Sequence, residues 1–238
     1  MRPSAGRVSM ARTMTPPGPR RLTRVVFGSA LVVPAVLAGW WLWKRPERVT
    51  SHFDDALDRA LGPVIEQSGA QHKLGAPTPT LTRVLARELA ERSVQYLSAR
   101  DLELWQNTRL RVARASPAAC ARLWKGGDAT FLGPAIAALG DETLDAYTEM
   151  LARGFALRLE RKPPPEPQLG AIDRGFVAIA ASLPDAARPS FEADIKRRDL
   201  SDARACELFL TLSNGTQKLE PLARMDFLRA LAKELQAP

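Results

Sequence analysis

An uncharged run of 19 residues, Val25 to Trp43, is the feature that most limits what this chain can form. At 1.5 Å per residue, a helix of this length spans roughly 28 Å, which is close to the hydrocarbon thickness of a bilayer. A backbone in lipid must satisfy its own hydrogen bonds, so we expect the run to be helical. The run ends in tryptophans followed by basic residues, as is typical where a helix reaches the membrane–water interface: Trp40, Trp41, Trp43, Lys44 and Arg45. We therefore predict a transmembrane helix over residues 25–43.

The positive charge of the chain precedes this run. The formal net charge is +8, and residues 1–24 contain six arginines and no acidic residue, so the remainder is nearly neutral. Arg20, Arg21 and Arg24 lie closest to the run, and this bias predicts a cytoplasmic tail over residues 1–24. Residues 44–238 are then periplasmic, in a bacterial inner-membrane protein with a single span. A nearly neutral domain is not typical of nucleic-acid binding, and membrane lipid is the first expected partner.

A cleaved signal peptide is the alternative to an anchor. Val36, Leu37 and Ala38 before Gly39 resemble a cleavage site with small residues. Cleavage there would leave a tryptophan-rich new N-terminus, which favours the anchor. Cleavage stays open as the alternative.

Apolar residues beyond position 50 recur with helical spacing, and no segment alternates with period two. We therefore predict an all-α protein: an N-terminal transmembrane helix followed by a multi-helix soluble bundle. Ser98 with Asp101, and Ser116 before Pro117, are typical helix starts, as is Ser201. The expected helices span roughly 51–67, 80–97, 99–115, 117–125, 128–139, 141–162, 169–183, 186–198, 202–213 and 220–235, with Asp141 as an N-cap and Asn214-Gly215 as a helix end.

Two segments are expected to be free of helix. Residues 69–79 are rich in Gly and Pro, which indicates a loop. The prolines of residues 163–167 predict an extended connector and a possible sub-boundary. Because each half alone would have a thin core, we favour a surface connection within one domain.

The two cysteines, Cys120 and Cys206, both lie on the apolar sides of predicted helices. Export to an oxidising compartment would allow them to form a disulfide. Two separate buried thiols are the alternative. Neither cysteine has a histidine nearby in the sequence, which argues against a catalytic thiol.

Other candidate chemistry is sparse. Two acidic clusters could act as acid and base if a cleft joined them, but helix N-terminal acids explain them as well. His52 and His72 belong to no metal-ligand spacing, so no metal and no cofactor are predicted. The arginines of the helix over 99–115 are interpreted as a solvated face. The acidic clusters are Asp54, Asp55 and Asp58, and Asp141, Glu142 and Asp145, and the arginines are Arg109, Arg111 and Arg114.

The segments 115–126 and 200–206, each containing one cysteine, resemble a loose group of proteobacterial envelope proteins. These are single-anchor, all-helical proteins with no assigned activity. The resemblance implies only a layout: an N-terminal anchor, a helical domain and paired cysteines. It carries over no catalytic residue.

Three functional hypotheses are consistent with these sequence features. The leading hypothesis is a non-catalytic interaction or adaptor module that holds an envelope protein partner near the membrane. The first alternative is an envelope enzyme that uses a carboxylate pair, which predicts adjacent carboxylates with shifted pKa values in a cleft. The second is a periplasmic module for a small ligand, which predicts an apolar cavity.

Overall fold

The computed structural model describes residues 51–125, 131–160, 163–197 and 199–235. The predicted transmembrane helix over 25–43, its interfacial residues Trp40 to Arg45 and the arginines before it lie outside these residues. Within the described ranges, no helix is both long enough and apolar enough to span a bilayer. Residues 49–238 group as one compact unit by their contacts.

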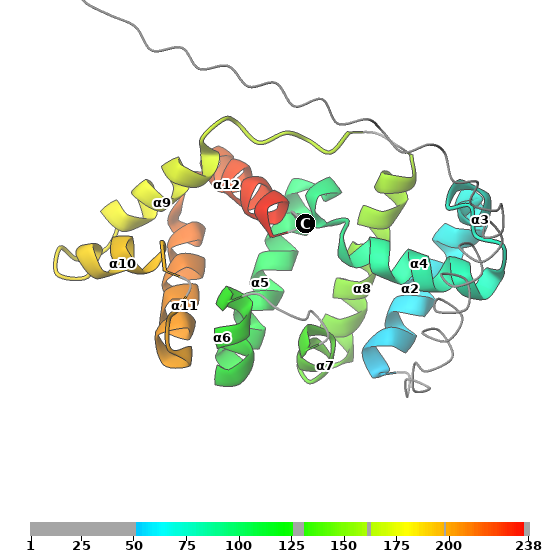
Figure 1. Cartoon of the computed structure of the whole chain (residues 1–238), viewed down its shortest axis with the longest axis horizontal. Coiled ribbons are helices and arrows are strands. Elements are labelled where there is room, and N and C mark those ends of the chain that lie inside the picture. Colours follow the sequence, from blue (N-terminus) through cyan, green and yellow to red (C-terminus); the bar gives the residue numbers. More distant parts are fainter. Residues whose placement is uncertain (1–50, 126–130, 161–162, 198, 236–238) are drawn as a thin grey trace, which may run out of the picture. The chain divides into compact units, whose positions relative to one another are not determined.

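The described residues are helical and contain no strand, so the all-α prediction is confirmed. The elements are α2 (His52–Ser68), α3 (Ala70–Lys73), α4 (Pro79–Glu91), the 3-10 turn η1 (Val94–Tyr96), α5 (Ala99–Ala115), α6 (Pro117–Lys125), α7 (Leu132–Ala137), α8 (Asp141–Leu159), α9 (Ala171–Ala181), α10 (Arg188–Asp194), α11 (Asp202–Lys218) and α12 (Pro221–Glu234) (Figure 1).

Serine caps begin three of these helices. The side chains of Ser51, Ser98 and Ser201 each accept a hydrogen bond from the backbone N–H three residues later, at the starts of α2, α5 and α11. Each bond satisfies a donor that the first helical turn leaves free. At α8 the prediction was wrong, because Gly140, with φ 103°, occupies the cap and Asp141 is the first helical residue.

Local signals placed several helix ends incorrectly. The predicted loop 69–79 contains the short helix α3, and the predicted helix 80–97 stops at Glu91 before η1. Helix α11 continues through Asn214-Gly215 to Lys218. A Cβ at Gly215 would lie 2.5 Å from Cγ2 of Ile179, so this glycine permits close approach of α9 and does not end the helix.

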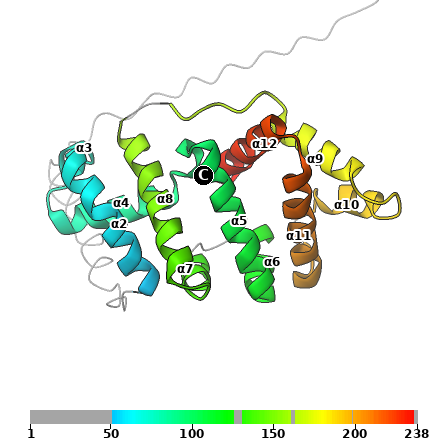
Figure 2. The same cartoon turned by 180° about the vertical axis from the view of Figure 1, so that it is seen from behind.

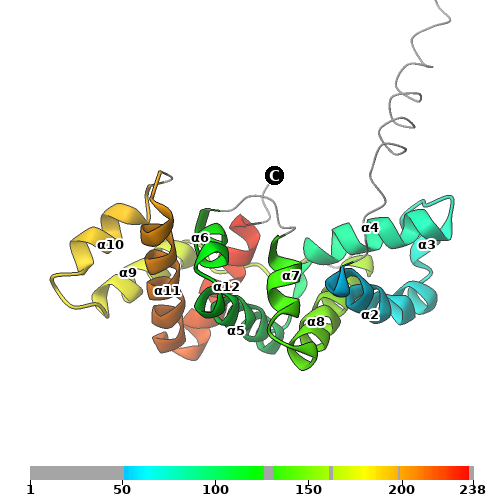
Figure 3. The same cartoon turned by 90° about the horizontal axis from the view of Figure 1, so that it is seen from below.

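Helices α5 and α6 lie between two groups of helices. Figures 1 and 2 show α2, α4 and α8 on one side and α9, α10 and α11 on the other, and Figure 3 shows the same order from below. One hydrophobic cluster includes Leu57, Leu102 and Phe155, and a second includes Ile179 and Phe227. Trp124 and Leu231 pack against both clusters, so the apolar core continues from one group to the other.

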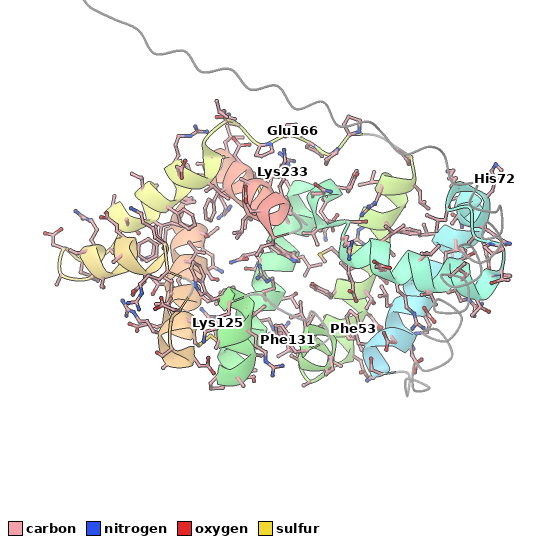
Figure 4. The ribbon with its side chains drawn as sticks, in the orientation of Figure 1. Phe53, His72, Lys125, Phe131, Glu166 and Lys233 are labelled. Atoms are coloured by element: carbon pink, nitrogen blue, oxygen red, sulfur yellow. A yellow bond between two sulfur atoms is a disulfide. The ribbon has the colours of Figure 1, made fainter. Side chains whose placement is uncertain are left out.

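The proline segment forms an extended connection between α8 and α9. Residues 163–168 contain no helix. Glu166 in this connection forms an ion pair with Lys233 of α12, with 2.7 Å between the charged atoms (Figure 4). The connection is therefore tied to a helix of the core.

Candidate functional site

A largely apolar cavity of about 200 Å³ is the best-defined candidate site. It is surrounded by α5, α6, α7, α8 and α12, with contributions from α2 and the segment around η1. Phe53 of α2 and Phe131, which precedes α7, both line the cavity and are labelled in Figure 4. The lining residues are Phe53, Glu91, Val94, Trp105, Arg109, Arg122, Leu123, Phe131, Leu132, Gly133, Tyr147, Leu151, Ala232 and Leu235.

A glycine shapes one wall of this cavity. A Cβ at Gly133 would lie 2.8 Å from the ring of Phe53, so only glycine lets α7 approach that ring so closely. The wall is therefore formed by α2 against the backbone of α7, which are distant in sequence.

Arg109 is the charged group buried deepest in the lining. It is only 6 % exposed. Its guanidinium carbon lies 4.4 Å from the centre of the Trp105 ring and 5.3 Å from that of Phe209. Nη2 donates a hydrogen bond of 3.2 Å to the backbone oxygen of Leu123, whereas Nη1 is buried and has no hydrogen-bond partner.

The position of Arg109 on α5 explains its burial. Leu102, Trp105 and Val112 are buried on the same helix, and residue 109 falls within this stripe of helical spacing. Trp105 lies one turn earlier on the same face, four residues from Arg109. The interpretation of Arg109 as part of a solvated face was therefore wrong, although Arg111 and Arg114 are exposed.

Burial shifts the pKa values of two side chains in the cavity lining, Arg109 and Tyr147. Burial lowers the pKa of Arg109 to about 10, which interaction with Tyr147 partly opposes, so the guanidinium keeps its charge at neutral pH. Burial also raises the pKa of Tyr147, and Glu91 adds to this effect while Arg109 opposes it. Tyr147 is therefore a neutral phenol at neutral pH.

Two further charged residues line the cavity. Arg122 is exposed, and its guanidinium carbon lies 5.6 Å from the centre of the Phe131 ring. Glu91 is the one carboxylate among the described lining residues. With Arg109, the described lining residues include two cations and one carboxylate.

Neither cysteine of the predicted pair lines the cavity. The sulfur atoms of Cys120 on α6 and Cys206 on α11 are at bonding distance, 2.01 Å, with 4.9 Å between the Cα atoms. The structure thus joins these two residues as a disulfide, as predicted. Of the two, Cys120 is completely buried.

The acidic clusters contribute to helix pairing. Arg87 of α4 contacts Asp54 and Asp58 of α2. Across α2 and α8, Arg59 lies 3.4 Å from Asp145. None of these carboxylates lines the cavity.

The predicted surface histidines also lie outside the cavity. His52 lies 3.6 Å from Asp141 at the start of α8, and His72 lies on α3 (Figure 4). Within the described residues, no group of three or more histidine, cysteine or acidic side chains is arranged to hold a metal.

Comparison with known proteins gives no relative. No protein family, curated protein or solved structure matches this chain. The residues of the cavity are therefore the basis for a functional proposal.

Proposed function

We propose that this chain is a non-catalytic binding module of the bacterial envelope, whose helical domain holds a small, largely apolar molecule. The cavity carries the proposal, because side chains from several helices enclose about 200 Å³ with mainly aromatic and aliphatic walls. Small-molecule sites are typically concave, apolar and equipped with a few polar groups. This is the small-ligand alternative of the sequence analysis, combined with the expected anchor.

The envelope location is supported by two independent features. Disulfides persist in oxidising compartments such as the periplasm, and Cys120 and Cys206 are at bonding distance. The arginines before residues 25–43 favour a cytoplasmic N-terminus and an exported domain. We therefore propose an inner-membrane anchor at residues 25–43 and a periplasmic domain.

An enzyme with a carboxylate pair has less support. Such a mechanism needs two carboxylates that converge on one cleft. Glu91 is alone among the described carboxylates in lining the cavity, and Asp54, Asp58 and Asp145 are engaged with arginines between helices. A binding role fits this distribution better than general acid and base chemistry.

Filling the cavity tests the proposed function. Ala232 of α12 is fully buried and lines the cavity, so Ala232→Leu should occupy part of its volume. We expect indole or hexanamide to bind the full-length protein in zwitterionic nanodiscs, and binding to weaken by about tenfold or more in this variant. Titration calorimetry, with empty nanodiscs as the blank, measures the affinity of each probe for the unaltered protein and for the variant.

The matched control is Ala223→Leu, which makes the same change at an exposed position of the same helix. This variant should bind the probes as the unaltered protein does. Equal affinities for the probes in all three proteins, or no binding of any apolar probe, would contradict the proposed function.

A protein-interaction role is the second candidate. Leu169, Val177 and Leu222 are 96 %, 69 % and 83 % exposed, before α9, on α9 and on α12. Apolar side chains that gather in one exposed patch mark the contact site of a partner protein. In-cell crosslinking, compared with a version that lacks residues 25–43, distinguishes an anchor-dependent envelope partner from none.

A further inference from the structure

The cavity lining contains a buried cation that has no partner of opposite charge among the residues that the structure describes. Arg109 is almost completely buried, and one of its terminal nitrogens, Nη1, makes no hydrogen bond. Among the described residues, no carboxylate forms an ion pair with it. Burial of an unpaired charge is costly, and folded proteins normally supply a counter-charge.

The two aromatic rings offset only part of this cost. Trp105 and Phe209 present their rings to the guanidinium at 4.4 and 5.3 Å, which is within the range of a cation–π contact. A ring quadrupole attracts the cation but accepts no conventional hydrogen bond from Nη1. The arrangement therefore holds the guanidinium in the cavity lining and leaves Nη1 without a hydrogen-bond acceptor.

The charges and the size of the cavity limit what can pair with Arg109. A cavity of about 200 Å³ suits a small molecule. Glu91 lines the same cavity and disfavours a second negative charge on a bound molecule. A planar guanidinium matches a carboxylate in both charge and hydrogen-bond geometry.

We infer that the cavity binds a small monocarboxylate, with an apolar body against the aromatic and aliphatic walls and its carboxylate on Arg109. This inference rests on the proposed binding function and adds the chemical class of the ligand. Arg109 would be the residue that distinguishes acids from neutral molecules of the same shape.

Benzoate and benzamide test this inference directly. The two molecules are flat and of equal size, and only benzoate is charged. With the full-length protein in zwitterionic nanodiscs, we expect benzoate to bind about tenfold or more tightly than benzamide, since a charge-assisted hydrogen bond replaces a neutral one. Hexanoate and hexanamide should show the same preference. Titration calorimetry, with empty nanodiscs as the blank, gives each affinity.

Matched arginine variants assign the preference to one residue. Arg109→Met should abolish the preference for benzoate and leave the affinity for benzamide nearly unchanged. Arg111→Met removes the same charge from an exposed position of α5 that does not line the cavity, and should keep the preference. If circular dichroism shows that Arg109→Met does not fold, Arg109→Lys replaces it. That variant should retain a reduced preference, because it keeps the charge and loses the planar donor pair.

The outcomes separate this inference from the function on which it rests. If the amides bind as tightly as the acids, or if Arg109→Met keeps the full preference for benzoate, the inference is overturned and the binding function stands. If neither acids, amides nor indole bind, the binding function fails and the inference fails with it. Tighter binding of the acids that depends on Arg109 supports both.

Discussion

At the scale of single residues, small side chains and one arginine contradict simple expectations. Helix α4 buries the small residues Thr82, Ala86 and Ala90, whereas its larger apolar residue Val84 is 43 % exposed. Small residues allow close packing of α4 on α2 and α8, which larger side chains on that face would prevent. Likewise, Arg109 is buried because its position on α5 faces the core.

Gly175 of α9 provides a test of close packing between helices. A Cβ at this position would lie 2.1 Å from Cδ2 of Phe227, whose ring is fully buried. We expect Gly175→Ala to lower the free energy of unfolding by about 1–3 kcal/mol, because the ring must move within a packed cluster. Urea unfolding followed by circular dichroism measures the change.

Val177 of α9 is the control, since it is 69 % exposed on the same helix. Val177→Ile also adds one carbon atom and should change the free energy of unfolding by less than about 0.5 kcal/mol. Equal effects of the two substitutions would show that α9 does not approach Phe227 as described.

At the scale of elements, caps and cross-helix pairs determine where helices begin and which helices meet. The start of α5 combines a serine cap with an ion pair to another helix. Ser98 caps the helix at Asp101, and Asp101 pairs with Arg153 of α8 at 2.7 Å. A local cap thus also links two helices that are distant in sequence.

The pKa of Asp101 predicts how this link responds to acid. Burial raises the pKa, but hydrogen bonds from Arg153 and Ser98 outweigh burial, so the pKa lies below its ordinary value of 3.8. A lowered carboxyl pKa stabilises the folded state at pH values above 3.8, and this contribution disappears as pH falls through the folded-state pKa. Because Arg153 is half exposed, solvent limits the contribution to roughly 1 kcal/mol or less.

Asp101→Asn should therefore lower the free energy of unfolding at pH 6 and have a smaller effect at pH 2, because the ionic contribution declines as the pH falls below 3.8. Urea unfolding at the two pH values measures this difference. An effect of the same size at both pH values would contradict an ionic contribution from Asp101.

At the scale of the whole molecule, the disulfide joins the central helix α6 to α11, and shared core residues connect the two groups of helices. Cys120 and Cys206 are 86 residues apart and link α6 to α11. Trp124 and Leu231 contribute to both hydrophobic clusters. The extended connection at residues 163–168 therefore lies between parts that are already held together by packing and by a covalent bond.

Reduction of the disulfide should lower the free energy of unfolding by about 4 kcal/mol, because a closed loop of this length restricts the unfolded chain. Thermal unfolding with and without reductant measures the loss without any change of sequence. The double variant Cys120→Ala/Cys206→Ala serves as the control, and reductant should not affect it.

The same bond can be tested in cells. Both cysteines should resist a thiol-blocking reagent until reductant is added. Free thiols in the native protein would argue against the bond, and with it against one of the two supports for a periplasmic location.

The sequence alone was sufficient for the features that depend on local physics. Helical spacing determined the all-α class, serines determined the starts of α2, α5 and α11, and prolines determined the extended connection at 163–167. Tertiary structure alone decided what depends on contacts between distant segments. The passage of α11 through Gly215 requires Ile179 of α9, and the cavity requires residues from α2 to α12. The sequence interpretation missed the burial of Arg109. The packing of α6, α8 and α11 around it decided that burial and left it without a counter-charge among the described residues, because a charge is paired or unpaired only in three dimensions.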